Sequence, residues 1–136
     1  MSAPAAVAHG GAGPGPDRQH NVEMALNRAA KILESGGSAI EAAVEACVAL
    51  ENDPVFNAGT GAVFRNDGSV SLDASIQTSD GRIGFVIGME NTPNPIRVAK
   101  DLLDEEINGL AAVSYTHLRA HETSLHRVCR LLLEKK

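Results

Sequence analysis

The sequence predicts an α+β fold in which helices are layered on an antiparallel sheet. Apolar residues recur at helical spacing in two consecutive segments, 21–35 and 38–51, a pattern typical of amphipathic helices. Between residues 70 and 89, apolar and polar residues alternate instead, which is the pattern of strands that bury one face. Helices beside antiparallel strands indicate a layered α+β fold.

Capping residues set the expected bounds of the first two helices. We expect the first to begin near Asn21, a good N-cap with Glu23 in the first turn. It should end at residues 36–37, two glycines that favour a left-handed C-cap. Ser38 then caps the second helix, and Glu41 completes a capping box, with a stop at residues 52–54. The expected buried positions are Val22, Ala25, Leu26, Ala29, Ile32 and Leu33 in the first helix, and Ile40, Ala43, Val44, Cys47, Val48 and Leu50 in the second.

A third helix is expected to open at Asn94 and Pro95, which suit the N-cap and the first helical position. Its expected core residues are Ile96, Ala99, Leu102, Leu103 and Ile107.

Turn residues divide the rest of the sequence into strands. The apolar run Ala5–Ala8 predicts a buried strand. Residues 63–65 lead into a strong hairpin signal, Asn66-Asp67-Gly68, and a second turn at residues 79–81 leads to the last strand of an antiparallel meander. One face of that strand is apolar and ready for burial, whereas glycines on the other would let a helix approach closely. The two faces carry Ile83, Phe85, Ile87 and Met89, and Gly84 and Gly88, respectively.

Composition and charge argue against several classes of function. The 136 residues suffice for one ordinary domain. A formal net charge of −5 argues against nucleic acid or an anionic membrane surface as a partner. Cys47 and Cys129 are too far apart to indicate a disulfide framework or a metal site. Because we find neither a signal peptide nor an apolar run long enough to span a membrane, we expect a cytoplasmic protein.

The N-terminal glycine turn, residues 9–13 (HGGAG), allows three interpretations when taken alone. A dinucleotide-binding fingerprint would need a further glycine step and a capped helix directly after it. The oxyanion loop of a lipase would need a G-x-S-x-G elbow, which the sequence lacks. The third interpretation is a tight structural turn, in which His9 is a packed, hydrogen-bonded histidine.

The combination of motifs is more specific than any one of them. After the glycine turn come residues 34–39 (ESGGSA), Leu50-Glu51 with Asp53-Pro54, Phe56-Asn57-Ala58-Gly59 with Gly61, Leu72-Asp73-Ala74-Ser75, and Asn94-Pro95-Ile96-Arg97. In this order, from Ala5 to about Ile107, the sequence resembles the plant-type L-asparaginases and isoaspartyl peptidases, which are N-terminal-nucleophile hydrolases of the threonine type.

The resemblance implies a four-layer αββα sandwich, of which this sequence would supply the N-terminal part of the α subunit. Such precursors cut themselves and expose a threonine nucleophile at the start of a β subunit, and its own amine serves as the base. The family cleaves the side-chain amide of L-asparagine and isoaspartyl (β-aspartyl) dipeptides, and we expect an (αβ)2 assembly. Carried over by position, Gly10 and Gly11 lie beside the threonine, and Asn57 points toward the same centre.

The resemblance also implies a structural monovalent cation, usually sodium, and no organic cofactor. Its ligands would be backbone carbonyls, which are unpaired and partly negative at the end of a helix. The alternative is a plain helix-terminating loop ordered by asparagine and aspartate side chains that bond their own backbone. The positions carried over are Leu50, Glu51, Asp53, Phe56, Ala58 and Thr60.

The catalytic threonine itself is missing from the sequence. Thr60 follows a glycine, but it stands in Asn-Ala-Gly-Thr-Gly, a loop position, and not in a Gly-Thr-Val-Gly cleavage site. We therefore expect the family activity from the full gene product and no catalysis by this chain. Asp73 is interpreted as a solvated or structural carboxylate. The preference for asparagine or isoaspartyl peptide stays open, as do the related glycosylasparaginases and taspases, because the discriminating pocket lies in the missing half.

The composition changes abruptly near the end of the sequence. Residues 114–136 carry five basic and two acidic groups, whereas all 13 glycines and all 6 prolines precede residue 110. We therefore divide the sequence into an α-subunit portion, residues 1–112, and a non-native tail, residues 113–136. The tail resembles a string found where translated metagenomic fragments run into library-adapter sequence. At face value it is a basic amphipathic helix, in which His117 and His121 could suggest metal but lack further ligands.

A second class of function is a non-enzymatic α+β module that binds a protein partner through an exposed sheet face and the basic tail. A stable monomer with cooperative unfolding would favour this module. An aggregating chain would favour the fragment, because half a sandwich exposes an unpaired sheet face and edge.

Overall fold

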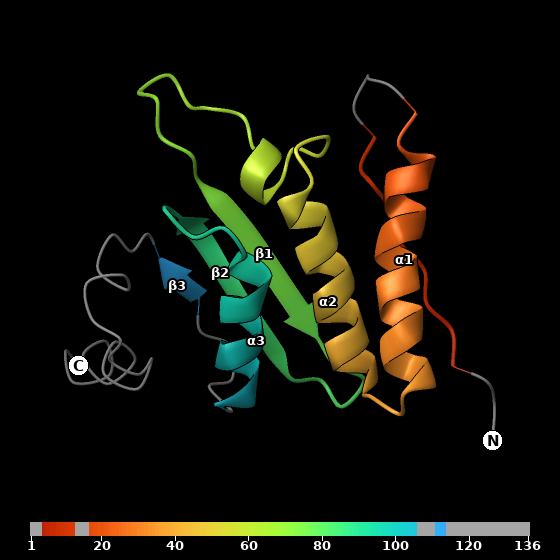
Figure 1. Ribbon diagram of the computed structural model, residues 1–136. Coiled ribbons are helices and arrows are strands. Elements are labelled where there is room, and N and C mark those ends of the chain that lie inside the picture. The colour runs from red at the N-terminus through yellow and green to blue at the C-terminus, as the bar shows by residue number, and fades with distance from the viewer. Residues whose placement is uncertain (1–3, 13–16, 106–110, 114–136) are drawn as a thin grey trace, which may run out of the picture.

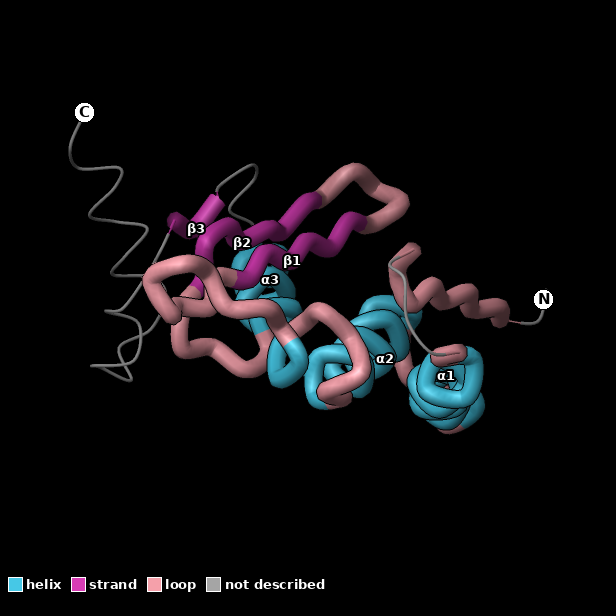
Figure 2. Tube along the Cα trace, turned by 90° about the horizontal axis from the view of Figure 1, so that it is seen from above, coloured by secondary structure: helices cyan, strands magenta, loops and turns pink. Residues whose placement is uncertain are grey.

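The computed structural model describes residues 4–12, 17–105 and 111–113. In this part of the chain, α3 covers one face of a small sheet, α2 packs beside α3, and α1 packs against α2 on the side away from the sheet (Figures 1 and 2). The described helices and strands are α1 (Gln19–Glu34), α2 (Ala39–Asn52), a short 3-10 helix η1 (Gly59–Gly61), β1 (Leu72–Gln77), β2 (Ile83–Met89), α3 (Pro95–Asp104) and β3 (Ala111–Val113). The predicted α+β class is confirmed.

The connection between α1 and α2 follows the capping signals in the sequence. The Gly36 N–H donates to the Leu33 carbonyl and the Gly37 N–H to the Ile32 carbonyl, which together form a Schellman motif. Gly36 has a φ of 85°, in the left-handed region that glycine adopts without strain. The capping box of Ser38 at the start of α2 is also present. These predictions are confirmed.

The prediction of Asn21 as the N-cap of α1 is wrong by three positions, because Asp17 supports the first turn instead. The Asp17 Oδ1 atom accepts a hydrogen bond from the Gln19 N–H at 2.9 Å, and the helix begins at Gln19 with Arg18 as N-cap. Asn21, inside the helix, is thereby able to donate its amide to Asp53 beyond the end of α2, at 2.6 Å.

Two segments predicted as strands are not strands in the structure. Residues 5–8 have no strand partner, and Val7 is 97% exposed. After residues 63 and 64, the Arg65 N–H donates to the Ser69 carbonyl at 2.8 Å and closes a turn. Residues 63–65 nevertheless form no strand, and Phe64 is 77% exposed. A strand needs a neighbouring edge to pair its backbone, and neither segment pairs with one within the described residues.

The sheet has the order β1–β2–β3, with β1 antiparallel to β2 and β3 parallel to β2. The β1–β2 hairpin is therefore as predicted, whereas residues 63–65, the predicted first strand of the meander, do not join it, and the parallel strand β3 was not predicted. Of the predicted third-helix core, Ile107 lies outside the described residues, as does the sequence after Val113.

The buried face of β2 is opposite to the one predicted. Gly84 and Val86 face α3 and are buried, whereas Phe85 is only half-buried and Ile87 is 51% exposed. The predicted close helix approach at Gly84 is real, since a Cβ atom there would lie 2.0 Å from the Ala99 carbonyl oxygen. The face that a helix approaches is the face that becomes buried, so the glycine marks the core side of the strand.

A β-bulge returns Met89 to the buried face. Between the pairs Leu72–Met89 and Ala74–Val86, β1 advances by two residues and β2 by three. Gly88 has a φ of 69°, and its N–H donates to the Asp73 carboxylate at 2.8 Å. Asp73 thus has a structural role, and the extra residue reverses the alternation of the strand.

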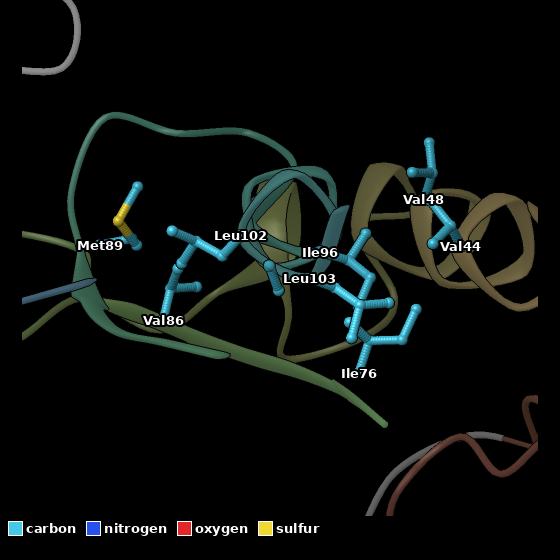
Figure 3. Close-up of a cluster of buried hydrophobic side chains, with 9 residues drawn as sticks. Val44, Val48, Ile76, Val86, Met89, Ile96, Leu102 and Leu103 are labelled. Atoms are coloured by element: carbon cyan, nitrogen blue, oxygen red, sulfur yellow. The ribbon is translucent and has the colours of Figure 1, made fainter. Parts of the chain in front are cut away.

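The core lies between α3, the sheet and the inner side of α2 (Figure 3). The predicted third-helix residues, apart from Ile107, are all buried. In α1, Ala25 and Ala29 are fully buried, and in α2 Ala42 is buried in place of the predicted Ala43. The buried cluster consists of Val44, Val48, Ile76, Val86, Met89, Ile96, Ala99, Leu102 and Leu103.

Candidate functional site

The loop that follows α2 begins with an aspartate that organises its first turn. The Asp53 Oδ1 atom accepts a hydrogen bond from the Val55 N–H at 3.0 Å, and the Asp53 carbonyl accepts one from the Phe56 N–H at 3.2 Å. The bonds from Val55 and then from Asn21 hold the pKa of the Asp53 carboxyl below its ordinary value. The loop is thereby fixed to α1 through Asn21 as well as to the end of α2.

Two glycines allow backbone carbonyls to crowd the far side of this loop. A Cβ atom at Gly59 would lie 2.2 Å from the Glu51 carbonyl oxygen and 2.9 Å from that of Pro93. A Cβ atom at Gly61 would lie 2.2 Å from the Phe56 carbonyl oxygen and 2.5 Å from that of Pro54. Only residues without a side chain fit here, so several carbonyl oxygens surround residues 59–61, which we call the glycine coil.

The loop supplies oxygen atoms of the kind that the predicted monovalent cation would need. A hard cation prefers oxygen ligands, and Glu51 and Phe56, two of the six predicted positions, direct their carbonyls toward the glycine coil. The carbonyls of Leu50, Asp53 and Ala58 each accept one backbone hydrogen bond but retain a second lone pair. All six positions, including Thr60 in η1, lie in one continuous stretch from the end of α2.

The glycine turn near the N-terminus lies against the same loop. A Cβ atom at Gly10 would lie 2.8 Å from the Phe56 ring and 3.0 Å from the Val22 side chain. Gly11 has a φ of 87° and donates its N–H to the His9 Nδ1 atom at 3.0 Å. The buried ring of Phe56 therefore brings together two motifs that lie more than forty positions apart in the sequence.

The Phe56 ring also lies near a positive charge. The Arg18 guanidinium lies 5.9 Å from the centre of the Phe56 ring, within the range of a cation–π interaction. Its buried Nε atom has no hydrogen-bond acceptor within the described ranges.

Asn57 follows Phe56 and bridges the loop. Its Oδ1 atom accepts a hydrogen bond from the Val63 N–H at 3.0 Å, which leaves the amide nitrogen of the exposed side chain available to a ligand. Asn57 and Glu51 both line an open groove of about 310 Å³, together with Ala58, Gly59, Ala62, Val63, Ser71, Leu72, Asp73 and Pro95. Gly10, Gly11 and Asn57, the three predicted supporting residues, thus belong to the turn and the loop that Phe56 connects.

The Glu51 side chain is a feature that the sequence reasoning missed. Glu51 is 7% exposed, and its carboxylate accepts hydrogen bonds from the Ile96 N–H at 3.1 Å and from the Asn94 amide at 3.0 Å. Burial raises the pKa of this carboxyl above its ordinary value, although the two hydrogen bonds oppose the rise. Glu51 follows Val44 and Val48 at helical spacing, a signal that it belongs to the buried face of α2.

Within residues 4–12, 17–105 and 111–113, no cluster of three or more His, Cys, Asp and Glu side chains could hold a metal ion. None of the helices in that same part of the chain is both long and apolar enough to cross a membrane.

Comparison with known proteins identifies the family. The family model described as asparaginase matches residues 2–125, which extends past the boundary that we predict at residue 112. Proteins named isoaspartyl peptidase/L-asparaginase from Macaca fascicularis and Homo sapiens are each 43% identical over 110 residues, covering 75% of this chain and 35% of the relative. A protein named plant-type L-asparaginase from Thermococcus kodakarensis is 34% identical over 131 residues, covering 87% of this chain and 42% of the relative.

The chain therefore spans about a third of the length of the first two relatives. The asparaginase model covers most of the chain, and the glycine turn, the α2 loop and the start of α3, which carry the resemblance, are connected in the structure. On these grounds the chain belongs to the asparaginase family, alongside the isoaspartyl peptidases and plant-type L-asparaginases.

Proposed function

We propose that this chain is the N-terminal portion of a self-processing threonine hydrolase that cleaves the side-chain amide of L-asparagine and of isoaspartyl dipeptides. The observation that carries the proposal is the contact between Gly10 and the Phe56 ring, because it joins the glycine turn to the loop that presents Asn57. Family membership supplies the reaction class, and the names of the relatives supply the substrates.

The glycine turn and Asn57 would support the chemistry without carrying it out. Acyl transfer builds negative charge on the carbonyl oxygen of the substrate, and fixed N–H donors lower the energy of that state. The backbone of Gly10 and Gly11 has no side chain to keep a threonine or substrate away. The amide of Asn57 is held on its oxygen side by Val63, so its nitrogen can donate in a fixed direction.

The nucleophile would come from a β subunit cut from the same precursor. In the proposed four-layer αββα sandwich, a second sheet covers the face of β2 that bears Phe85 and Ile87, which is partly exposed here. Two such αβ units would form the (αβ)2 assembly. The non-enzymatic alternative gains no support from the comparisons.

A sodium ion held by the carbonyls of Leu50, Glu51, Asp53, Phe56, Ala58 and Thr60 would order the loop that presents Asn57. The carbonyls around Gly59 and Gly61 support this proposal. The ion would neutralise the partial negative charge where α2 ends and would take no part in bond cleavage.

The first experiment tests whether this chain is inactive alone. Purified protein is incubated with L-asparagine and with an isoaspartyl dipeptide, and the release of aspartate is followed. We expect none above the buffer rate, because no threonine of the chain stands in a Gly-Thr-Val-Gly segment. Hydrolysis by this chain would contradict the proposal.

The second experiment tests the family function with a chimera. Residues 4–112 replace the corresponding residues of the Homo sapiens relative, which keeps its own remaining sequence. We expect the chimera to cut itself into two subunits and to release aspartate from both substrates. The matched control replaces the threonine nucleophile of the chimera by alanine, which should abolish both reactions. A folded chimera that neither cuts itself nor hydrolyses either substrate would refute the proposal.

A further inference from the structure

Glu51 contacts two parts of the fold, the loop after α2 and the first turn of α3. Its carbonyl oxygen lies against the glycine coil, 2.2 Å from the place where a Cβ atom of Gly59 would be. The two carboxylate oxygens of its side chain accept hydrogen bonds from the Ile96 N–H and from the Asn94 amide. One residue therefore contacts both the loop after α2 and the first turn of α3.

The contacts close into a ring. Gly59 lies against the carbonyl of Pro93 as well as that of Glu51, and Pro93 precedes Asn94, whose amide is bound to the Glu51 carboxylate. Asn94 also donates to the Asn52 side chain at 3.0 Å. The glycine coil cannot move away from α2 without opening this ring.

The carboxylate takes over the capping role that Asn94 leaves open. Asn94 is the N-cap of α3, but its side chain makes no capping hydrogen bond to the helix. The first N–H groups of a helix need a partner, and a negative charge there also interacts favourably with the helix dipole. Ile96 is 4% exposed, so in the intact fold its N–H depends on the Glu51 carboxylate for a hydrogen-bond partner.

We propose that the Glu51 carboxylate is a positioning residue of the site: it holds the Asn57 loop, residues 53–63, in place by fixing it to the first turn of α3. The order of the loop and the order of this helical turn are then coupled. The link to catalysis rests on the proposed function, whereas the coupling itself is a property of this chain.

Amide hydrogen exchange on the full chain tests the coupling. Glu51→Ala should speed exchange at the Ile96 amide by about tenfold to a hundredfold, because a hydrogen bond to a charged group is lost. It should also speed exchange at the Gly61 and Val63 amides, which report on the loop, by about threefold to tenfold. The Gly37 amide, bound to Ile32 at 2.9 Å, serves as the internal reference and should not change.

Two further variants separate positioning from general loss of structure. Glu51→Gln has nearly the same shape and can still accept from the Ile96 N–H, so it should restore most of the protection and remain usable if the alanine variant does not fold. Glu45→Ala removes another carboxylate of α2, which pairs with Arg97 of α3 at 2.7 Å on the surface. It should leave exchange at Ile96, Gly61 and Val63 unchanged.

The outcomes also distinguish this inference from the proposed cation. If Glu51→Ala or Glu51→Gln speeds exchange at Ile96 alone, or if Glu45→Ala has the same effect on the loop, the positioning role is overturned. The cation is tested separately by exchanging sodium for choline at equal ionic strength in the wild-type chain. A loop that is indifferent to this exchange refutes the sodium proposal, while the effect of the Glu51 variants on the loop still decides the coupling.

Discussion

The two faces of β2 differ in how far the described part of the chain covers them: one is buried beneath α3, and the other is partly exposed. On the inner face, Gly84 and Val86 are buried beneath α3, and a bulge brings Met89 to the same side. On the outer face, Phe85 is half-buried and Ile87 is 51% exposed. The comparison indicates that the stability of this chain comes from the inner face, whereas the outer face is suited to a further layer.

The largest expected effect comes from emptying the inner face. Leu103 belongs to the core cluster and is 1% exposed. Leu103→Ala should lower the free energy of unfolding by about 2–5 kcal/mol, because it leaves a buried cavity. Ile87→Ala on the outer face should cost about 0.5 kcal/mol or less. Urea unfolding followed by circular dichroism measures both. Equal losses would show that the two faces are equally packed, against the comparison.

The outer face should instead control self-association. Ile87→Lys places a charge among exposed apolar groups and should reduce the average mass measured by sedimentation, with little change in unfolding. The same loss of association from Leu103→Ala, without unfolding, would contradict this division between the faces.

The next effect comes from the close approach of α3 to the strand. Gly84→Ala should lower the free energy of unfolding by about 2–3 kcal/mol, since the new methyl group would press on the backbone of Ala99 and Leu103. The matched control is Gly68→Ala, where nothing lies within 4 Å but φ is 81°, so backbone strain alone should cost about 1 kcal/mol. A smaller loss at Gly84 than at Gly68 would mean that α3 is not held against this face.

These two faces also show where sequence reasoning succeeds and where it stops. Local signals were sufficient for the Schellman motif at Gly36 and the capping box at Ser38, because each involves residues within one turn. They also predicted Asn94 and Pro95 at the start of α3, although the carboxylate that accepts from its first turn belongs to Glu51. The face of β2 was predicted wrongly, because alternation was counted without the bulge at Gly88 and without knowing which side α3 covers. Residues 5–8 were predicted as a strand from apolar content, but strands also require a partner edge.

The candidate site follows the same division. The motifs placed Gly10, Gly11 and Asn57 as candidates, and the structure connects their segments through Phe56. The role of the Glu51 carboxylate was missed, because its partners at residues 94 and 96 are more than forty positions away. A charged residue in register with the buried face of a helix is the signal that could have identified it.

Variants of Asp73 test whether its carboxylate holds the bulge, and we expect an intermediate loss in the free energy of unfolding. Asp73→Ala removes the acceptor of the Gly88 N–H and should lower the free energy of unfolding by about 1 kcal/mol. Asp73→Asn keeps a side-chain oxygen at this place and should cost less. Exchange at the Gly88 amide, measured by NMR, reports on the bulge directly. If it is unchanged in Asp73→Ala, the bulge does not depend on this carboxylate and Met89 is held inward by packing alone.

The smallest effect is expected at the turn that sets the register of the two faces, between β1 and β2. The Asp80 carboxylate accepts hydrogen bonds from the Thr78 hydroxyl and from Arg82, which hold its pKa below the ordinary value of 3.8. A carboxyl with a lowered pKa stabilises the fold above its unfolded pKa, and this contribution is lost as the pH falls through the lower, folded pKa.

Unfolding midpoints in urea, measured as the pH is lowered from about 5, should therefore fall less steeply in Asp80→Asn than in the wild type. Thr78→Val removes the first of the two partners while retaining the carboxylate, so the pH at which stability is lost should move up toward 3.8. Both effects should be small, because Asp80 is exposed and solvent weakens its interactions. If both variants lose stability over the same pH range as the wild type, the turn does not depend on this charge. The register that directs Gly84 and Val86 toward α3 must then come from strand pairing and the bulge.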